Sequence, residues 1–132
     1  LSNLVANHMV KEKKGSIIIL SSITAVLGTD NIGAYGISKA AEAALVRNLA
    51  VELGPKGIRV NGIAPGLIKT DFSRALWENP SHLRRQENST PLRRIGTPDD
   101  IAGIAHFLAC EASSFITGQL IIADGGETIS WT

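Results

Sequence analysis

A short, unbroken apolar run, Ile17 to Leu20, constrains the fold of this chain more than any other sequence feature. Three of its four residues are β-branched, and a run without polar alternation predicts a strand that is buried on both faces. Strands of that kind belong to parallel sheets, whose neighbouring strands are joined by long crossovers that are usually helices. The sequence therefore predicts an α/β fold built on a parallel sheet.

Helical and strand patterns alternate along the rest of the chain. Helices are expected over residues 1–13, 34–53 and 97–109 and, in shorter form, over 72–77 and 81–88; strands are expected over 17–20, 58–64 and 120–123. In the first helix, Leu4, Val5, His8 and Met9 fall on one face. The alternation implies parallel pairing with right-handed crossovers. Three such strands with helices on both faces make half of a doubly wound, Rossmann-like sheet.

Length and composition narrow the possible functions. A chain of 132 residues, 44% of them hydrophobic, suggests one domain with a packed core. The net charge of +1 gives no attraction to nucleic acid or to a membrane surface, and no apolar stretch reaches the roughly 18 residues of a membrane span. The three histidines share no metal-ligand spacing, so no metal site is expected. Cys110 is the only cysteine, which excludes an intrachain disulfide and favours a cytoplasmic location.

Three side chains stand where catalytic chemistry is possible. Ser22 follows the strand at 17–20, and open α/β sheets bind ligands at the carboxyl ends of their strands. Tyr35 and Lys39 lie four residues apart near the start of the long helix and so share one helical face. A phenol, with an ordinary pKa of about 10, exchanges protons near neutral pH only when a neighbouring cation favours its anion. A serine hydroxyl can hold a substrate oxygen against that phenol. From the residues alone, an exposed Tyr–Lys pair and a turn serine stay open as alternatives.

These residues resemble the signature of a known family, the short-chain dehydrogenase/reductases. The string Tyr35-Gly36-Ile37-Ser38-Lys39 matches the family's Tyr-x-x-x-Lys motif, and Ser22 stands thirteen positions before Tyr35, as the catalytic serine does in the family. Further family landmarks are matched in order by residues 58–66, 94–98, 116–119 and 124–126. The resemblance therefore covers almost the whole chain. Within the family, the stretch 65–74 is similar to that of broad-specificity carbonyl reductases.

The resemblance implies an activity and assigns residues to it. It implies NAD(P)-dependent hydride transfer between an alcohol and a ketone or aldehyde. In this scheme Tyr35 is the general acid/base, Lys39 favours its anion and holds the nicotinamide ribose, and Ser22 orients the substrate carbonyl. The implied cofactor-binding residues are Tyr35, Lys39, Pro65, Gly66, Ile68 and Thr70, and the implied substrate-binding residues are Ser22, Phe72, Leu76 and Trp77. The last three follow Thr70 in a segment that forms a mobile lid in the family, although they would also suit a core. Asn61 is expected to be structural.

The resemblance is to the C-terminal half of such an enzyme, so residues 1–132 are expected to form a single partial domain without the N-terminal βαβ half. That half carries the glycine-rich turn for the pyrophosphate, the residue that selects NAD or NADP, and a catalytic asparagine. We therefore expect NAD(P)(H) in the complete protein but no cofactor bound by this chain alone. Two function classes stay open: a piece of an enzyme, or a non-catalytic truncated or split chain that self-associates or pairs with a full-length relative. The family further implies a homodimer or homotetramer built on the helices at 1–13 and 34–53.

Overall fold

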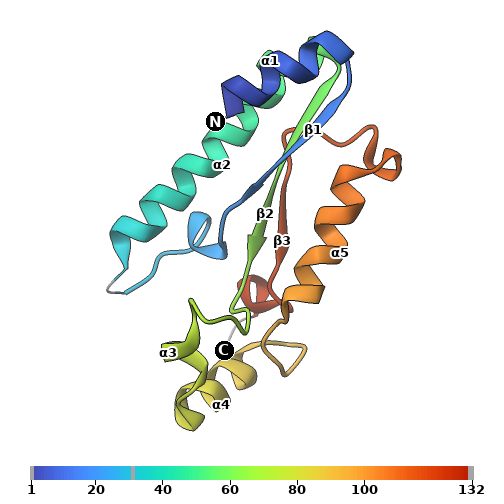
Figure 1. The fold of residues 1–132 in the computed structure, drawn as a ribbon. Coiled ribbons are helices and arrows are strands. Elements are labelled where there is room, and N and C mark those ends of the chain that lie inside the picture. The colour runs from blue at the N-terminus through green and yellow to red at the C-terminus, as the bar shows by residue number, and fades with distance from the viewer. Residues whose placement is uncertain (1, 31, 131–132) are drawn as a thin grey trace.

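The computed structural model describes residues 2–30 and 32–130 and has the expected α/β order of elements (Figure 1). The elements are α1 Ser2–Glu12, β1 Gly15–Leu20, α2 Gly33–Leu53, β2 Ile58–Pro65, α3 Arg74–Trp77, α4 Pro80–Ser89, α5 Pro98–Ala109 and β3 Leu120–Ala123. The three strands and the helices lie where the sequence predicts them, with ends that differ by at most two residues. Leu1, placed in the first predicted helix, is outside the described residues. The segment predicted as a loop between β1 and α2 contains one 3₁₀ turn, η1 Ile23–Ala25.

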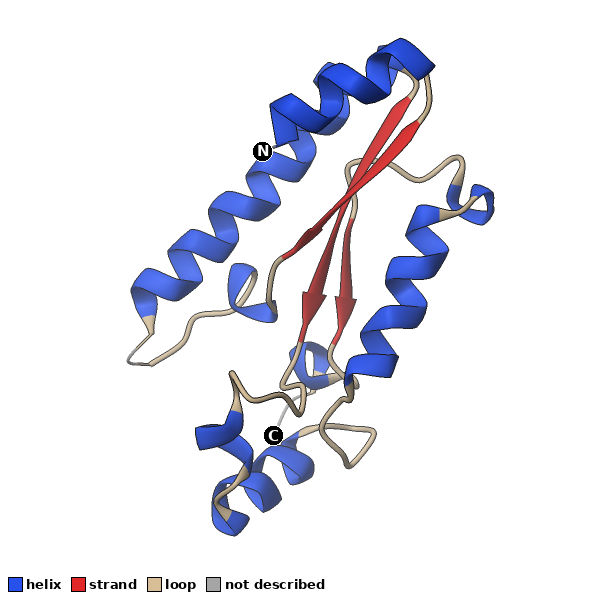
Figure 2. Ribbon diagram, viewed as in Figure 1, coloured by secondary structure: helices blue, strands red, loops and turns tan. Residues whose placement is uncertain are grey.

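The three strands form one parallel sheet in the order β1-β2-β3. In the register, Leu20 pairs with Ile63 of β2, and Pro65 of β2 pairs with Ala123 of β3. Parallel pairing places the carboxyl ends of all three strands at the same edge of the sheet, and Figure 2 shows the arrowheads of β2 and β3 pointing toward the end of the molecule where α3 and α4 lie. Helices α1 and α2 lie on one side of the sheet and α5 on the other (Figure 1). The predicted half of a doubly wound sheet is thus confirmed.

The main core forms between the sheet and the helices α1 and α2. Its buried residues are Ala6, Leu49, Ala50, Leu53, Ile58 and Val60, and Met9, Val10, Ile17 and Ile19 pack against them. The face of α1 predicted from the sequence is wrong in part, because Leu4 and Val5 are exposed. The residues of α1 that reach the core are Ala6, Met9 and Val10, which follow the i, i+3, i+4 spacing of one helical stripe. Small alanines in α1 and α2 suit helices that lie close to a sheet.

Asn61 joins β2 to the turn that leads into β3. Its side chain is fully buried, its Nδ2 donates to the carbonyl of Ile116 at 2.8 Å, and its Oδ1 accepts from the backbone N–H of Gln119 at 3.1 Å. The neighbouring Thr117 accepts from the Val60 N–H through its Oγ1 at 3.0 Å. A buried amide without partners would destabilise the fold, and here its hydrogen bonds fix the position of the turn. The prediction that Asn61 is structural is confirmed.

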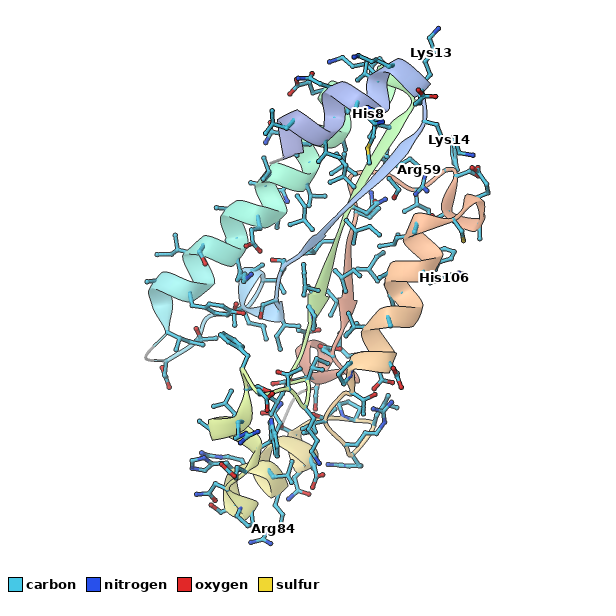
Figure 3. The ribbon with its side chains drawn as sticks, in the orientation of Figure 1. His8, Lys13, Lys14, Arg59, Arg84 and His106 are labelled. Carbon is cyan, nitrogen blue, oxygen red and sulfur yellow. The ribbon has the colours of Figure 1, made fainter. Side chains whose placement is uncertain are left out.

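Arg59 closes the opposite edge of the sheet, at the amino ends of the strands. Its guanidinium donates to the carbonyls of Leu108 and Cys110 at 2.9 and 3.2 Å and to Ser113 Oγ at 2.9 Å. Figure 3 labels Arg59 beside the C-terminal end of α5, far from α3 and α4. A cation at this helix end satisfies carbonyls that have no partner within the helix. Arg59, the basic residue of β2, therefore has a structural role. Candidate catalytic residues are to be sought at the carboxyl edge of the sheet instead.

The fold leaves apolar surface that a second copy of the chain could cover. Among the described residues no strand pairs with the outer edge of β1, and Ile37, Leu45 and Val51 are exposed on α2. An open strand edge next to exposed apolar side chains favours association. We predict that the 132-residue chain is a dimer or a larger oligomer at micromolar concentration, with α1 and α2 in the contact. Light scattering coupled to size-exclusion chromatography measures this, and a clean monomer would refute it.

Candidate active site

The end of β1 is fastened both to the sheet and to the long helix α2 by Ser21. Its backbone N–H donates to the carbonyl of Ile63 in β2 at 2.7 Å, and its buried Oγ donates to the carbonyl of Lys39 in α2 at 2.9 Å. A buried hydroxyl with a backbone partner fixes the relative position of the two elements that it joins. Ser21 therefore sets where the first turns of α2 lie relative to the carboxyl edge of the sheet.

Ser22, the next residue, begins the 3₁₀ turn η1. Its backbone is extended, with φ −162°, and its half-buried side chain caps the turn by accepting from the Thr24 N–H at 3.2 Å. A serine hydroxyl that accepts one bond still has its own proton to donate. Ser22 is thus a cap of the turn, as the turn-serine alternative holds, and at the same time a hydroxyl at the carboxyl end of a parallel strand.

Tyr35 and Lys39 lie in the first turns of α2, on one helical face, as their spacing predicts. The Lys39 ammonium lies 5.6 Å from the centroid of the Tyr35 ring, and its Nζ donates to the carbonyl of Leu20, two residues before Ser22, at 3.3 Å. Between Tyr35 and Lys39, Gly36 lets η1 approach, because a Cβ there would lie 3.3 Å from the Thr24 carbonyl oxygen. The fold thus brings the end of β1 and the start of α2, with the three predicted catalytic side chains, to one place.

A carboxylate that the sequence reasoning missed completes this group. Glu42 lies three residues after Lys39, and both of its carboxylate oxygens are 3.0 Å from the Lys39 Nζ. Glu42 and Ser21 both contact the predicted site, yet neither carries a motif of its own. The i, i+3 spacing of opposite charges was a usable signal for Glu42. Nothing in the sequence distinguished the role of Ser21 from that of Ser22.

The predicted cofactor loop leaves β2 and is held against the end of β3. The Gly66 N–H donates to the Ala123 carbonyl at 3.0 Å, and a Cβ on Gly66 would lie 2.9 Å from the Cα of Asp124, so only glycine permits this approach. Further along, Ile68 forms a parallel bridge with Gly96, in which Lys69 N donates to Gly96 O at 2.9 Å. The loop is therefore positioned by backbone contacts on both sides.

Thr70 is tied to the segment that follows it by a compact set of hydrogen bonds. The Ser73 side chain is buried; it lies 3.1 Å from the Thr70 hydroxyl and donates to the Ile68 carbonyl at 2.5 Å. Trp77 Nε1 donates to the Thr70 carbonyl at 3.0 Å, and the Lys69 ammonium lies 5.1 Å from the Trp77 ring centroid. These bonds connect the predicted cofactor loop to α3, and Ser73 is a second residue that the sequence reasoning missed.

The three predicted substrate residues that follow Thr70 differ in how exposed their side chains are. Trp77 is half-buried against the loop, whereas Phe72 is 88% exposed and Leu76 is 57% exposed. Neither exposed side chain belongs to the core, so the core alternative for Phe72 and Leu76 is wrong. Both lie on the segment that leaves the carboxyl edge of the sheet.

A cavity of about 500 Å³ lies next to the cofactor loop rather than around the three catalytic candidates. It shares Leu67 and Ile68 with that loop and is otherwise lined by residues from 86–100 and 122–127. Volume alone does not identify a reaction centre, because this cavity contains neither a proton donor placed against a cation nor a serine at a strand end. The Ser22–Tyr35–Lys39 group has both, and we take it as the candidate active site.

Two acidic residues near the cavity hold backbone turns. The pKa of Asp124 lies below its ordinary value: burial raises it, but hydrogen bonds from the backbone N–H groups of Thr128 and Gly126 together outweigh that effect. The hydrogen bonds from Arg94 at 2.7 and 2.8 Å, together with those from the backbone and side chain of Thr97, lower the pKa of Asp100. Thr97 and Asp100 form a capping box at the start of α5. Both acids therefore serve structure.

Neither a metal-ligand cluster nor a membrane-spanning helix is found in the part of the chain that the structure describes. In residues 2–30 and 32–130 there is no group of three or more histidine, cysteine or acidic side chains that could hold a metal ion. No helix in that part of the chain is both long and apolar enough to cross a membrane. What the site offers is a hydroxyl, a phenol and a paired ammonium at the carboxyl edge of a parallel sheet.

This arrangement defines a class of protein, namely the C-terminal half of a doubly wound α/β domain with a Ser–Tyr–Lys group at the carboxyl edge of its sheet. Residues 1–128 match the family model described as Enoyl-(Acyl carrier protein) reductase. The chain is 44% identical over 126 residues to Dehydrogenase/reductase SDR family member 4 of Sus scrofa, and 40% identical over 130 residues to 5-keto-D-gluconate 5-reductase of Escherichia coli. The chain belongs to the short-chain dehydrogenase/reductase family.

Solved structures agree with the family. A gluconate 5-dehydrogenase from Burkholderia cenocepacia, in complex with NADP and tartrate, superposes with a TM-score of 0.95 at 34% identity, over 98% of this chain and 51% of that one. A short-chain type dehydrogenase/reductase from Mycobacterium ulcerans superposes with a TM-score of 0.91 at 42% identity, over 95% and 46%. The matched part covers 96% of this chain and 45% of the Sus scrofa relative, and 98% and 51% for the Escherichia coli relative. The chain thus spans about half the length of the curated relatives that it matches.

Proposed function

We propose that this chain is the catalytic half of an NAD(P)-dependent oxidoreductase that interconverts an alcohol and a ketone or aldehyde. The observation that carries the proposal is the meeting of Ser22, Tyr35 and Lys39 at the carboxyl edge of the sheet. Lys39 is anchored there by the Leu20 carbonyl, and its ammonium lies 5.6 Å from the Tyr35 ring. Membership in the short-chain dehydrogenase/reductase family supports the same reaction class.

In the proposed mechanism each side chain has one role. Tyr35 gives a proton to the substrate oxygen during carbonyl reduction and takes it back during alcohol oxidation. The Lys39 ammonium stabilises the phenolate, because an opposite charge within a few ångströms favours the charged form. Ser22 keeps its Thr24 contact and donates its own proton to the substrate oxygen, which orients that oxygen toward Tyr35. A bound nicotinamide cofactor would supply the hydride.

The residues of the loop suit the nicotinamide end of such a cofactor. A carboxamide needs one donor and one acceptor, and Thr70 offers a hydroxyl oxygen while Ile68 offers a backbone N–H that bonds to no described residue. Pro65 and Gly66 bring this loop off the end of β2, close to β3. Tyr35 and Lys39 would face the nicotinamide ribose from α2. Two similar solved structures that contain NADP or NADH are consistent with either form of the cofactor.

For the substrate we propose alcohols and carbonyl compounds with a hydrophobic body. Phe72 and Leu76 present exposed apolar surface on the segment after Thr70, and Trp77 adds a half-buried indole. Such side chains gain most by covering an apolar ligand. The names of several similar proteins indicate sugar acids as their substrates, and these form the competing class. A complete enzyme that turned over only sugar acids would contradict the proposal.

The second function class is a chain that has catalytic residues but no activity of its own. The chain spans about half of its relatives, and an open edge at β1 would suit self-association or pairing with a full-length relative. This class and the enzyme differ in one property, which is turnover by the complete protein.

The proposed mechanism predicts a loss of catalysis when the phenol of Tyr35 is removed in the complete protein. Tyr35→Phe removes only the phenolic oxygen, so the fold should be kept while turnover falls by roughly two to four orders of magnitude, the usual contribution of a positioned acid/base. Steady-state consumption of NAD(P)H with a ketone measures the effect. Ser38→Ala is the matched control, because Ser38 is an exposed residue of the same helical turn and its hydroxyl donates to the Tyr35 carbonyl. Near-normal turnover of Tyr35→Phe would remove the assignment.

The second prediction concerns the 132-residue chain by itself. It should bind NADH and NADPH no more tightly than millimolar, because the residues proposed here touch only the nicotinamide end of the cofactor. Losing the contacts to the diphosphate and adenosine costs several kcal/mol, and about 4 kcal/mol separates micromolar from millimolar affinity. Isothermal titration calorimetry provides the measurement. Micromolar binding of either cofactor would mean that the site is built in another way.

A further inference from the structure

The ammonium of Lys39 is held by a carboxylate that the proposed mechanism does not use. Its Nζ lies 3.0 Å from both oxygens of Glu42 and donates to the Leu20 carbonyl at 3.3 Å. The Lys39 side chain is 19% exposed and the Glu42 side chain 33% exposed. Water and salt screen a half-buried pair less than an exposed one, so Glu42 neutralises much of the charge of Lys39 at this site.

No other charge in the surrounding elements has this relation to Tyr35 and Lys39. Neither β1 nor η1 carries a titratable side chain. In β2 the only one is Arg59, which is bound at the opposite edge of the sheet to Leu108, Cys110 and Ser113. Asp30 is exposed in the loop before α2. The other charged residues of α2 are Arg47 and Glu52, which lie two or more turns beyond Lys39. Lys56 follows the far end of the helix. Glu42 is therefore the negative charge that acts on the Tyr35–Lys39 pair.

We propose that Glu42 is a positioning residue that holds Lys39 and limits how strongly its ammonium favours the Tyr35 phenolate. The inference rests on the proposed roles of Tyr35 and Lys39. An ammonium with a carboxylate at 3.0 Å presents a nearly neutral pair to a phenol several ångströms away, whereas the ammonium alone presents a full positive charge. The charge of Glu42 therefore reduces the stabilisation that Lys39 can give to the Tyr35 phenolate during proton transfer.

The chain contains a single tyrosine, so its phenolate absorbance in the ultraviolet reports on Tyr35 alone. Glu42→Gln keeps the size of the side chain and an oxygen acceptor but removes the charge. The midpoint of the absorbance titration should move to lower pH by about half to one unit, because a like charge near the phenolate is removed. Glu52→Gln, an exposed change on the same helix, should leave the midpoint unchanged. Circular dichroism at each pH restricts the comparison to folded protein.

Two results would overturn the inference: a Glu42→Gln midpoint that coincides with that of the unaltered chain, or one that moves to higher pH. Glu42→Ala is measured in parallel and should shift in the same direction, so that the test survives if one variant folds poorly. In the complete protein, the acidic limb of the kcat/KM profile for alcohol oxidation should move to lower pH by a similar amount. An inactive complete protein would refute the proposed function, while the absorbance titration would still decide the role of Glu42.

Discussion

The junction at Ser21 is the interaction on which the candidate site depends. Its N–H extends the hydrogen bonding of β1 to Ile63 of β2, and its Oγ fixes the carbonyl of Lys39 in α2. The parallel register from Gly15↔Ile58 to Leu20↔Ile63 brings the ends of the two strands together. One residue thus determines how far the helix that carries Tyr35 and Lys39 stands from the strand end that carries Ser22. The hydrogen bond from Lys39 to the Leu20 carbonyl and the close approach of η1 to Gly36 both depend on that distance.

The fold was predictable from the sequence because its determinants are local. The β-branched run Ile17 to Leu20 favours a strand of a parallel sheet, and the Thr97-Pro98-Asp99-Asp100 start of α5 carries its own capping chemistry. The expected burial of this strand on both faces is wrong for the described residues, because Ile17 to Ile19 are half-buried and Leu20 is exposed. The convergence of Ser22 with Tyr35 and Lys39 was predictable for a topological reason, since the carboxyl ends of parallel strands share one edge. Their chemical roles came from the family resemblance and remain proposals.

What the sequence did not reveal depends on contacts between distant residues. The stripe of α1 that faces the core is set by the angle at which the helix crosses the sheet, so Leu4 and Val5 are exposed while Ala6 is buried. Ser21 and Ser22 look alike in a sequence, and only the position of α2 separates an anchor from a free hydroxyl. Ser73 is distinguished by burial beside Ile68 and Thr70. The side-chain positions of Phe72 and Leu76 were likewise beyond prediction, because both side chains are largely exposed.

The two adjacent serines allow the most direct test of this account. In the complete protein, kcat and the melting temperature are measured for Ser22→Ala and for Ser21→Ala. We expect Ser22→Ala to lose about a hundredfold in kcat or more, because it removes a donor to the substrate oxygen. Its melting temperature should fall only slightly, because the variant also loses the cap of η1 at the Thr24 N–H. Ser21→Ala should instead leave kcat near normal and cost about 0.5–1.5 kcal/mol of stability, because it removes the hydrogen bond that joins β1 to the Lys39 carbonyl in α2. A Ser22→Ala protein that retained normal kcat would contradict the assignment of the active site.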